Sequence, residues 1–281
     1  MRINQQFYWT VLGGVSIVFH IWLIFSGLIP NLVSRPLHMA LALPWCLMYG
    51  RHGLSLRLGT LLTVVGIFCC AYIVLNQEIL SDQYGYISSM WQTGVAILLL
   101  TIVLEMARRS IGWPLPCVAL TALCYGLFGQ YLPGEFGHPG LPLNSFLGTM
   151  TIAEGGIWGK LTGVSVNVVA IFVIFGAVLN AGEAGQGFMN LATAAAGHLK
   201  AGVAKVSVLS SALFGSISGS ASANVASTGS FTLPAMIRQG YPRDFAAAVE
   251  AVASSGGQIM PPLMGAGAFV MVELTGIPYT K

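Results

Sequence analysis

The sequence predicts an all-α fold built from several helices that cross a membrane. Of its 281 residues, 55% are hydrophobic and only 7% are charged, and the mean hydropathy is +0.77. Soluble domains carry about 25% charged residues, so this composition excludes an ordinary soluble globule. The apolar stretches have the length of membrane helices and lack the short alternating segments typical of an outer-membrane barrel. We therefore predict a polytopic helical membrane protein.

Six apolar stretches of spanning or near-spanning length come first along the chain. They fall at about 9–29, 37–49, 58–76, 90–107, 114–132 and 161–181. Arg and Lys gather mainly in alternate loops, the bias that orients membrane helices with their positive loops in the cytoplasm. Glu105 precedes Arg108 and Arg109 at helical spacing, so we expect a local ion pair near the membrane surface. The positive residues behind the net charge of +3 thus indicate how the helices are oriented in the membrane, and they indicate no nucleic-acid partner.

The next apolar stretch, from Val203 to Met236, is too long for one span, and positive charges flank both of its ends. Because both ends favour the cytoplasm, we predict that it enters and leaves the membrane on one side, as a re-entrant helical hairpin. Its centre, LFGSISGSASANVASTG, carries polar residues at alternate positions: Ser216, Ser218, Ser220, Ser222 and Asn224. Two interpretations stay open. Either the small residues only pack helices, or the polar groups bind an ion or a substrate.

A broken helix follows the hairpin. The helical pattern from Asp244 to Thr275 is interrupted by the motif GGQIMPP at residues 256–262. Two glycines add conformational freedom and two prolines remove backbone donors, so we predict a break there. The break is either a passive kink or one side of an ion site, with Gln258 as a neutral polar group in the gap.

Glu250 is an acid within the otherwise apolar part of this broken helix. An acid inside a membrane helix is a functional candidate, with a structural hydrogen bond to a neighbouring helix as the alternative. No GxSxG or HExxH motif occurs and the five histidines are scattered, so we do not expect an enzyme. The five cysteines include no CxxC pair, and we expect them to be buried spectators.

Five long motifs stand out from residue 104 onward. They are LEMARRSIGWPLP (104–116), YLPGEFGHPG (131–140), GKLTGVSVNVVAIFVIFGAVLNAG (159–182), AKVSVLSSALFGSISGSASANVASTGSFTLPAMIRQGYP (204–242) and FAAAVEAVASSGGQIMPPLMGAGAFVMVE (245–273). Together they resemble the fused membrane subunit of TRAP transporters, and the resemblance is closest to the TAXI type. It implies a small scaffold domain of about five helices at 1–135. Residues 136–281 would be the first half of an elevator-type transport domain, with the hairpin at 203–236 and the broken helix at 244–275.

The resemblance implies a secondary active transporter subunit in the bacterial inner membrane. Such a transporter takes up small organic anions such as dicarboxylates, which a periplasmic TAXI-type substrate-binding protein delivers. Uptake in the family is usually coupled to Na⁺, with H⁺ as the alternative coupling ion, and no other cofactor is implied. A membrane scaffold or assembly subunit that transports nothing is the alternative function.

In the family, the hairpin tip and the broken helix build one sodium site. Carried onto this chain, the ion-binding residues are Ser218, Ser220, Asn224, Gly257, Met260 and Pro262, the last three through main-chain carbonyls. The residues expected near the substrate are Ser216, Ser222 and Gln258. Ala221 stands where many relatives have a further hydroxyl, so the oxygen that replaces it stays open. Family members continue into a second, inverted half, so we expect this chain to be the N-terminal portion of a longer protein, with a split subunit as the alternative.

Overall fold

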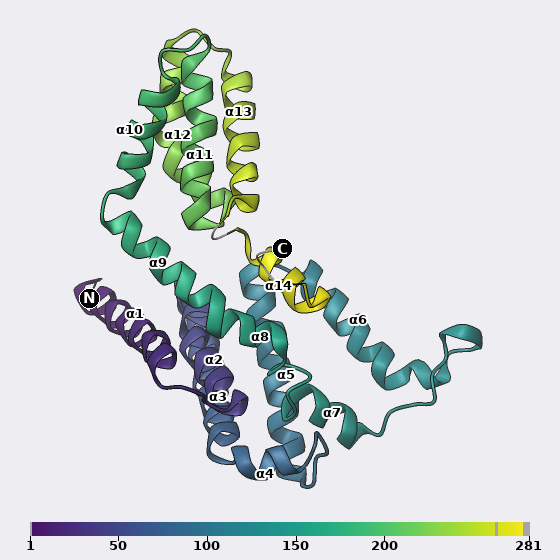
Figure 1. Ribbon diagram of the computed structural model, residues 1–281. Coiled ribbons are helices and arrows are strands. Elements are labelled where there is room, and N and C mark those ends of the chain that lie inside the picture. Colours follow the sequence, from purple (N-terminus) through teal and green to yellow (C-terminus); the bar gives the residue numbers. More distant parts are fainter. Residues whose placement is uncertain (1, 262–263, 278–281) are drawn as a thin grey trace. The chain divides into compact units, whose positions relative to one another are not determined.

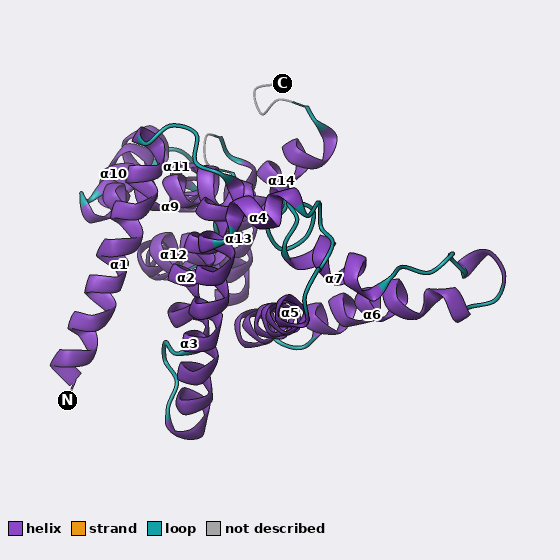
Figure 2. Ribbon diagram, turned by 90° about the horizontal axis from the view of Figure 1, so that it is seen from below, coloured by secondary structure: helices purple, strands orange, loops and turns teal. Residues whose placement is uncertain are grey.

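The computed structural model describes residues 2–261 and 264–277. All regular elements in those residues are helices, as the sequence predicts (Figures 1 and 2). The chain divides into two compact units, Met1–Val166 and Asn167–Lys281. This division follows contacts within the fold, and the functional boundary expected near residue 135 stays a prediction.

The helices of the first unit follow the predicted apolar stretches. They are α1 (Arg2–Phe25), α2 (Asn31–Leu47), α3 (Gly53–Leu75), α4 (Gln77–Asp82), α5 (Met90–Ile111), α6 (Pro114–Phe128), α7 (Leu143–Thr151) and α8 (Lys160–Val164). Four helical stretches of the described chain are long and apolar enough to cross a membrane: Gln6–Phe25, Gly53–Leu75, Met90–Ile111 and Lys160–Leu179. The stretch expected at 114–132 forms a shorter helix, α6, followed by the 3-10 turn Gly129–Tyr131.

The core of the first unit lies where α2, α3 and α5 pack together. Leu43, Leu47, Ile73, Leu99 and Ile102 are all completely buried there. Many other large apolar side chains of α3 and α5 stay exposed. Exposed apolar surface on this scale is expected of helices that face lipid.

The predicted ion pair of Glu105 is present within α5. Arg108 Nε lies 2.6 Å from one carboxylate oxygen of Glu105, and Arg109 Nε lies 2.5 Å from the other. Arg109 also donates from Nη1 to the Leu47 carbonyl at 2.8 Å. The close approach of α3 to the end of α2 requires a glycine at position 59 of α3, because a Cβ there would lie 2.2 Å from the Leu47 oxygen.

The second unit contains the predicted hairpin and the broken helix. Its helices are α9 (Ala170–Ala181), α10 (Ala184–Ala196), α11 (Gly202–Ser218), α12 (Ala221–Arg238), α13 (Arg243–Gly256) and α14 (Ala266–Thr275). A π-helical segment, Ser165–Val169, joins α8 to α9. In Figure 1, α11 and α12 run antiparallel, and α13 packs beside them in the direction of α11. The C-terminal ends of α11 and α13 therefore lie at the same end of this three-helix bundle.

Local sequence explains how the hairpin turns and where the long helix breaks. Gly219 ends α11 in the left-handed conformation with φ +59, which glycine adopts without strain. Ser220 then caps α12 by accepting a hydrogen bond from the Ala223 amide at 3.3 Å. After α13 the chain forms a 3-10 turn, Gly257–Ile259, and becomes extended at Met260. The break thus lies in the motif in which the sequence predicts it.

Candidate functional site

The hairpin and the helix break touch each other through two glycines. A Cβ on Gly215 would lie 2.3 Å from the Gly257 Cα, and a Cβ on Gly257 would lie 2.9 Å from the Gly215 Cα. Side chains at either position would force the two backbones apart, so the glycines allow the last turn of α11 to rest on the end of α13. The carbonyls at these two helix ends are thereby brought close together.

Asn224 ties this contact together from α12. Its side chain is completely buried. The Nδ2 group donates to the Ser211 carbonyl at 2.8 Å and lies 3.5 Å from the Ser254 carbonyl, so one side chain links all three helices. Among the described residues, its Oδ1 accepts only a long hydrogen bond of 3.4 Å from Thr228. An amide oxygen held rigidly with spare acceptor capacity is a suitable ligand for a cation.

Ser218 is the last residue of α11, at the hairpin tip. Its Oγ atom is buried and has no hydrogen-bond partner within the part of the chain that the structure describes. A buried hydroxyl without a partner costs about 1–3 kcal/mol, so such a group calls for an explanation. Binding an ion would satisfy this oxygen.

The other predicted ligands are engaged differently. Ser220 is exposed and serves as the α12 cap, and the Gly257 carbonyl accepts from the Met260 amide at 3.3 Å. The Met260 carbonyl accepts from the Met264 amide at 3.2 Å. Pro262 lies outside the described residues. Of the predicted ligands, the structure therefore brings Asn224 and Gly257 into direct contact. The contacts between the hairpin tip and the helix break themselves are made by Gly215 and Gly219.

The residues expected near the substrate lie around this same end of the bundle. The Ser216 hydroxyl donates to the Leu213 carbonyl at 2.7 Å, and Ser222 is exposed. The Gln258 side chain is exposed too, while its carbonyl accepts from the Gly265 amide at 2.6 Å. None of the three side chains contacts another of them through a hydrogen bond in the described residues.

Four helix ends converge at the tip, two of each polarity. The C-termini of α11 and α13 meet through Gly215 and Gly257. The N-terminus of α12 follows immediately at the tip, and the chain leading into α14 lies beside it, because a Cβ on Gly265 would be 3.5 Å from the Gly219 carbonyl oxygen. Helix C-termini carry partial negative charge and N-termini partial positive charge. One end of this bundle therefore brings together partial charges of both signs.

Glu250 lies on α13, about two turns before the break, and is only 1% exposed. Its Oε2 accepts from Ser207 at 2.7 Å and from Thr232 at 2.5 Å, and its Oε1 accepts from Thr228 at 2.5 Å and from Ser254 at 3.2 Å. These four residues, which we call the hydroxyl cage, come from three helices. Glu250 thus has the hydrogen bonds to neighbouring helices that the sequence left as one of two alternatives.

Sequence reasoning missed the cage, although a signal for it exists. Asn224, Thr228 and Thr232 follow one another at intervals of four residues, which places them on one face of α12. Glu250 and Ser254 share a face of α13 in the same way. Polar residues at helical spacing within apolar helices indicate a buried polar face.

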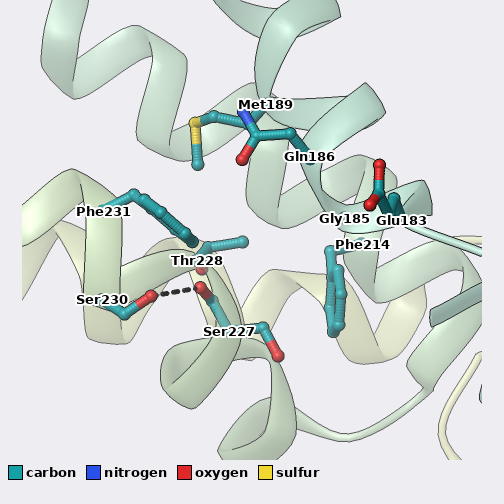
Figure 3. A pocket seen from close by; sticks show the side chains of 9 residues that line it. All are labelled: Glu183, Gly185, Gln186, Met189, Phe214, Ser227, Thr228, Ser230 and Phe231. Atoms are coloured by element: carbon teal, nitrogen blue, oxygen red, sulfur yellow. Dashed lines mark hydrogen bonds between the residues drawn. The ribbon is translucent and has the colours of Figure 1, made fainter. Parts of the chain in front are cut away.

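A cavity of about 500 Å³ lies beside the cage, between α10, α11 and α12 (Figure 3). Its lining consists of Glu183, Gly185, Gln186, Met189, Phe214, Ser227, Thr228, Ser230 and Phe231. Thr228 belongs to both features, because it lines the cavity and hydrogen-bonds Glu250. A single side chain, that of Thr228, therefore contacts both the cavity and the buried carboxylate.

The ligand chemistry of this unit suits a hard cation. The available groups are carbonyl, amide and hydroxyl oxygens, which such ions prefer. In the described residues no group of three or more His, Cys, Asp or Glu could hold a metal ion.

Comparison with known proteins agrees with the resemblance at the level of the family. Residues 98–281 match the family described as the tripartite ATP-independent periplasmic transporter, DctM component. The C4-dicarboxylate TRAP transporter large permease protein DctM of Rhodobacter capsulatus is 36% identical over 128 residues, which are 44% of this chain and 29% of that protein. No solved structure gives a significant match.

Two further relatives carry different names within the same family. The isethionate TRAP transporter permease protein DctMQ of Oleidesulfovibrio alaskensis is 37% identical over 94 residues, 34% of this chain and 15% of the relative. The ectoine TRAP transporter large permease protein TeaC of Halomonas elongata is 26% identical over 167 residues, 59% of this chain and 36% of the relative. The chain thus matches less than two fifths of the length of each of these relatives. Because the family match covers well over half of the chain, the chain belongs to the DctM family of TRAP transporter large permeases, which are membrane transporters rather than enzymes.

Proposed function

We propose that the chain is part of a TAXI-type fused membrane subunit that couples the uptake of small organic anions to Na⁺. In this proposal residues 1–135 form the scaffold domain, and residues 136–281 form the first half of a transport domain that moves as an elevator. Helices α11 and α12 are its re-entrant hairpin. The subunit lies in the bacterial inner membrane and receives its solute from a periplasmic TAXI-type binding protein. The names of the relatives, which refer to C4-dicarboxylates, isethionate and ectoine, support a small organic acid as the solute.

The observation that carries the proposal is the meeting of the hairpin tip with the helix break. Two helix C-termini, α11 and α13, converge there through Gly215 and Gly257, and their partial negative charge favours a cation. The Ser218 hydroxyl and the Asn224 amide oxygen add side-chain ligands, the first without any protein partner in the described residues. Oxygen ligands around a break between half-helices are the arrangement by which secondary transporters bind Na⁺.

The same geometry gives a reason for coupling. The N-termini of α12 and α14 lie at this end of the bundle and favour an anion. Na⁺ bound between α11 and α13 would hold the tip against the break and so fix the anion site beside it. Each ligand then stabilises the state that binds the other, which is coupling by differential affinity.

The test is uptake of a radiolabelled C4-dicarboxylate by the membrane subunit, reconstituted in liposomes and supplied with its binding protein under an imposed Na⁺ gradient. We expect the gradient to drive uptake, and Ser218→Ala to raise the Na⁺ concentration for half-maximal uptake by about tenfold, as the loss of one good oxygen contact does. Ser255→Ala is the matched control, because that hydroxyl is exposed and only bonds the Ala251 carbonyl in its own helix. Uptake that ignores both the Na⁺ gradient and Ser218→Ala would refute the sodium coupling, and the absence of any uptake would favour the alternative, a membrane scaffold whose small residues only pack helices.

A further inference from the structure

We propose that Glu250 and its hydroxyl cage form a proton-binding site that is linked through Thr228 to the hairpin tip. The proton site is inferred from the contacts of Glu250 and does not depend on the proposed function. Only its linkage to Na⁺ rests on the proposed function. The site consists of one buried carboxylate whose hydrogen-bond partners among the described residues are all hydroxyls, at distances from 2.5 to 3.2 Å.

In the part of the chain that the structure describes, no positively charged group pairs with Glu250. The other charged groups on the helices packed against it, α11, α12 and α13 itself, are Lys205, Arg238, Arg243 and Asp244. All four are exposed, and across the described residues none forms an ion pair with Glu250. A buried carboxylate without a counter-charge is costly, and such groups commonly become neutral by taking up a proton.

The cage can satisfy Glu250 in both protonation states. Each hydroxyl has one proton to donate and can also accept. When Glu250 is ionised, Thr228 and Thr232 donate to its two oxygens. When one proton binds to the carboxylate, Glu250 donates to Thr232 Oγ1 instead, and Thr232 turns its own proton to the Thr228 carbonyl, 3.1 Å away. Protonation therefore leaves no cage hydroxyl without a partner and requires no movement of the helices.

Thr228 links this proton to the candidate cation site. Its single hydroxyl proton has four possible acceptors within reach: Glu250 Oε1 at 2.5 Å, the Asn224 carbonyl at 2.8 Å, Ser211 Oγ at 3.2 Å and Asn224 Oδ1 at 3.4 Å. An ionised Glu250 draws the proton away from Asn224 and leaves Oδ1 open to a cation. A neutral Glu250 attracts the Thr228 proton less strongly, so Thr228 donates more readily to Asn224, and the protonation of Glu250 also removes a nearby negative charge. Both effects weaken cation binding, so a proton on Glu250 and a cation at the tip oppose each other, and the linkage is reciprocal.

The cavity in Figure 3 supplies a route for the proton. Its lining combines hydroxyl, amide and carboxylate groups with the apolar side chains of Met189, Phe214 and Phe231, and it is large enough to hold several water molecules. Thr228 stands between this cavity and Glu250. Protons can reach the buried carboxylate from the cavity through one hydroxyl group.

The contact distances favour a proton over a metal ion at Glu250 itself. Oxygens that share a cation at about 2.3–2.6 Å stand about 3 Å or more from one another. Three of the four cage hydroxyls lie 2.5–2.7 Å from the carboxylate, which is hydrogen-bond spacing. The cage is therefore built around hydrogen bonds to the carboxylate.

Infrared difference spectroscopy tests the proton site directly on the purified membrane subunit in lipid. We expect a carboxylic-acid C=O band that disappears as the pH rises and that is absent from Glu250→Gln, while Asp244→Asn, which removes an exposed acid of the same helix, keeps it. A wild-type protein without such a band, or a titrating band that survives in Glu250→Gln, overturns the proposal.

Binding of radioactive Na⁺ across the same pH range tests the linkage. We expect the Na⁺ affinity of the wild type to fall about tenfold or more on acidification, within the usual range of such couplings. Thr228→Val, which removes only the linking hydroxyl, should keep the infrared band but reduce the pH dependence of Na⁺ affinity, and it serves as the test if Glu250→Gln does not fold. An unchanged pH dependence in Thr228→Val contradicts the link. If the wild type binds no Na⁺ at any pH, the sodium coupling of the proposed function fails, and the infrared titration by itself decides the role of Glu250.

Discussion

Two adjacent glycines at the end of α13 should respond in opposite ways to the same substitution. A Cβ on Gly257 would lie 2.5 Å from Asn224 Nδ2, 2.9 Å from the Gly215 Cα and 3.2 Å from the Ser211 carbonyl oxygen. A Cβ on Gly256 would meet no atom of the described residues within 4 Å. Both glycines have helical backbone angles, with φ −61 for Gly256 and −58 for Gly257, so alanine strains neither backbone.

The size of the effect follows from these distances. Two of the three close atoms at Gly257 belong to the backbone of α11, which cannot rotate away, so Gly257→Ala must push the hairpin off the helix break. Overpacking of this kind costs about 1–3 kcal/mol. If the same energy is lost from ion binding, the Na⁺ affinity falls by a factor of about 5–150. Gly256→Ala gains helix propensity instead, up to about 1 kcal/mol.

Thermal unfolding of the purified membrane subunit in detergent and the Na⁺ dependence of solute uptake measure the two effects. We expect Gly257→Ala to unfold at a lower temperature and to need more Na⁺ than the wild type. Gly256→Ala should unfold at the same or a higher temperature with its Na⁺ dependence unchanged. If the two variants are equally stable and use Na⁺ equally well, the contact between hairpin and break does not control ion binding, and the reasoning is refuted.

Two predictions concern the first unit. Gly59→Ala should lower the unfolding temperature, at a cost of about 1–3 kcal/mol, because its Cβ would lie 2.2 Å from the Leu47 carbonyl oxygen. The control Gly94→Ala, whose Cβ would meet nothing within 4 Å in the described chain, should leave the unfolding temperature unchanged. Equal stability of the two variants would contradict the packing of α2 on α3. Glu105→Gln should destabilise the protein by about 1.5–3 kcal/mol, the range for hydrogen bonds to charged groups, because the Arg109 side chain is 5% exposed and would lose its counter-charge. An unchanged unfolding temperature would show that the Leu47 and Ser55 carbonyls suffice to hold this arginine.

Most of the long helices and the position of the helix break could be predicted from the sequence because they depend on local properties, whereas the shorter helices α4, α7 and α10 were not predicted. Apolar length sets each membrane helix, and the motif GGQIMPP interrupts the helical pattern wherever it is placed. The pairing of Glu105 with Arg108 and Arg109 is equally local, since residues three and four apart meet on any helix. The identity of the family followed from long motifs and is confirmed by the match over residues 98–281.

The candidate site could be predicted only in part. The sequence placed polar residues at a hairpin tip, yet it did not distinguish Ser218, whose buried Oγ has no partner in the described residues, from Ser220, which caps α12. It singled out Glu250 but not the hydroxyls around it. Partners such as Ser207 are more than forty residues away, and their meeting depends on how three helices rotate against one another.

The sequence by itself determined that this chain is helical, spans a membrane and turns back on itself at a polar tip before a broken helix. Those features need only hydropathy, charge bias and the backbone chemistry of Gly and Pro. The tertiary structure decided that Gly215 rests on Gly257, that Asn224 links three helices and that four hydroxyls surround Glu250. The reason is physical: a helix fixes which residues share a face, but close packing between helices fixes what that face meets.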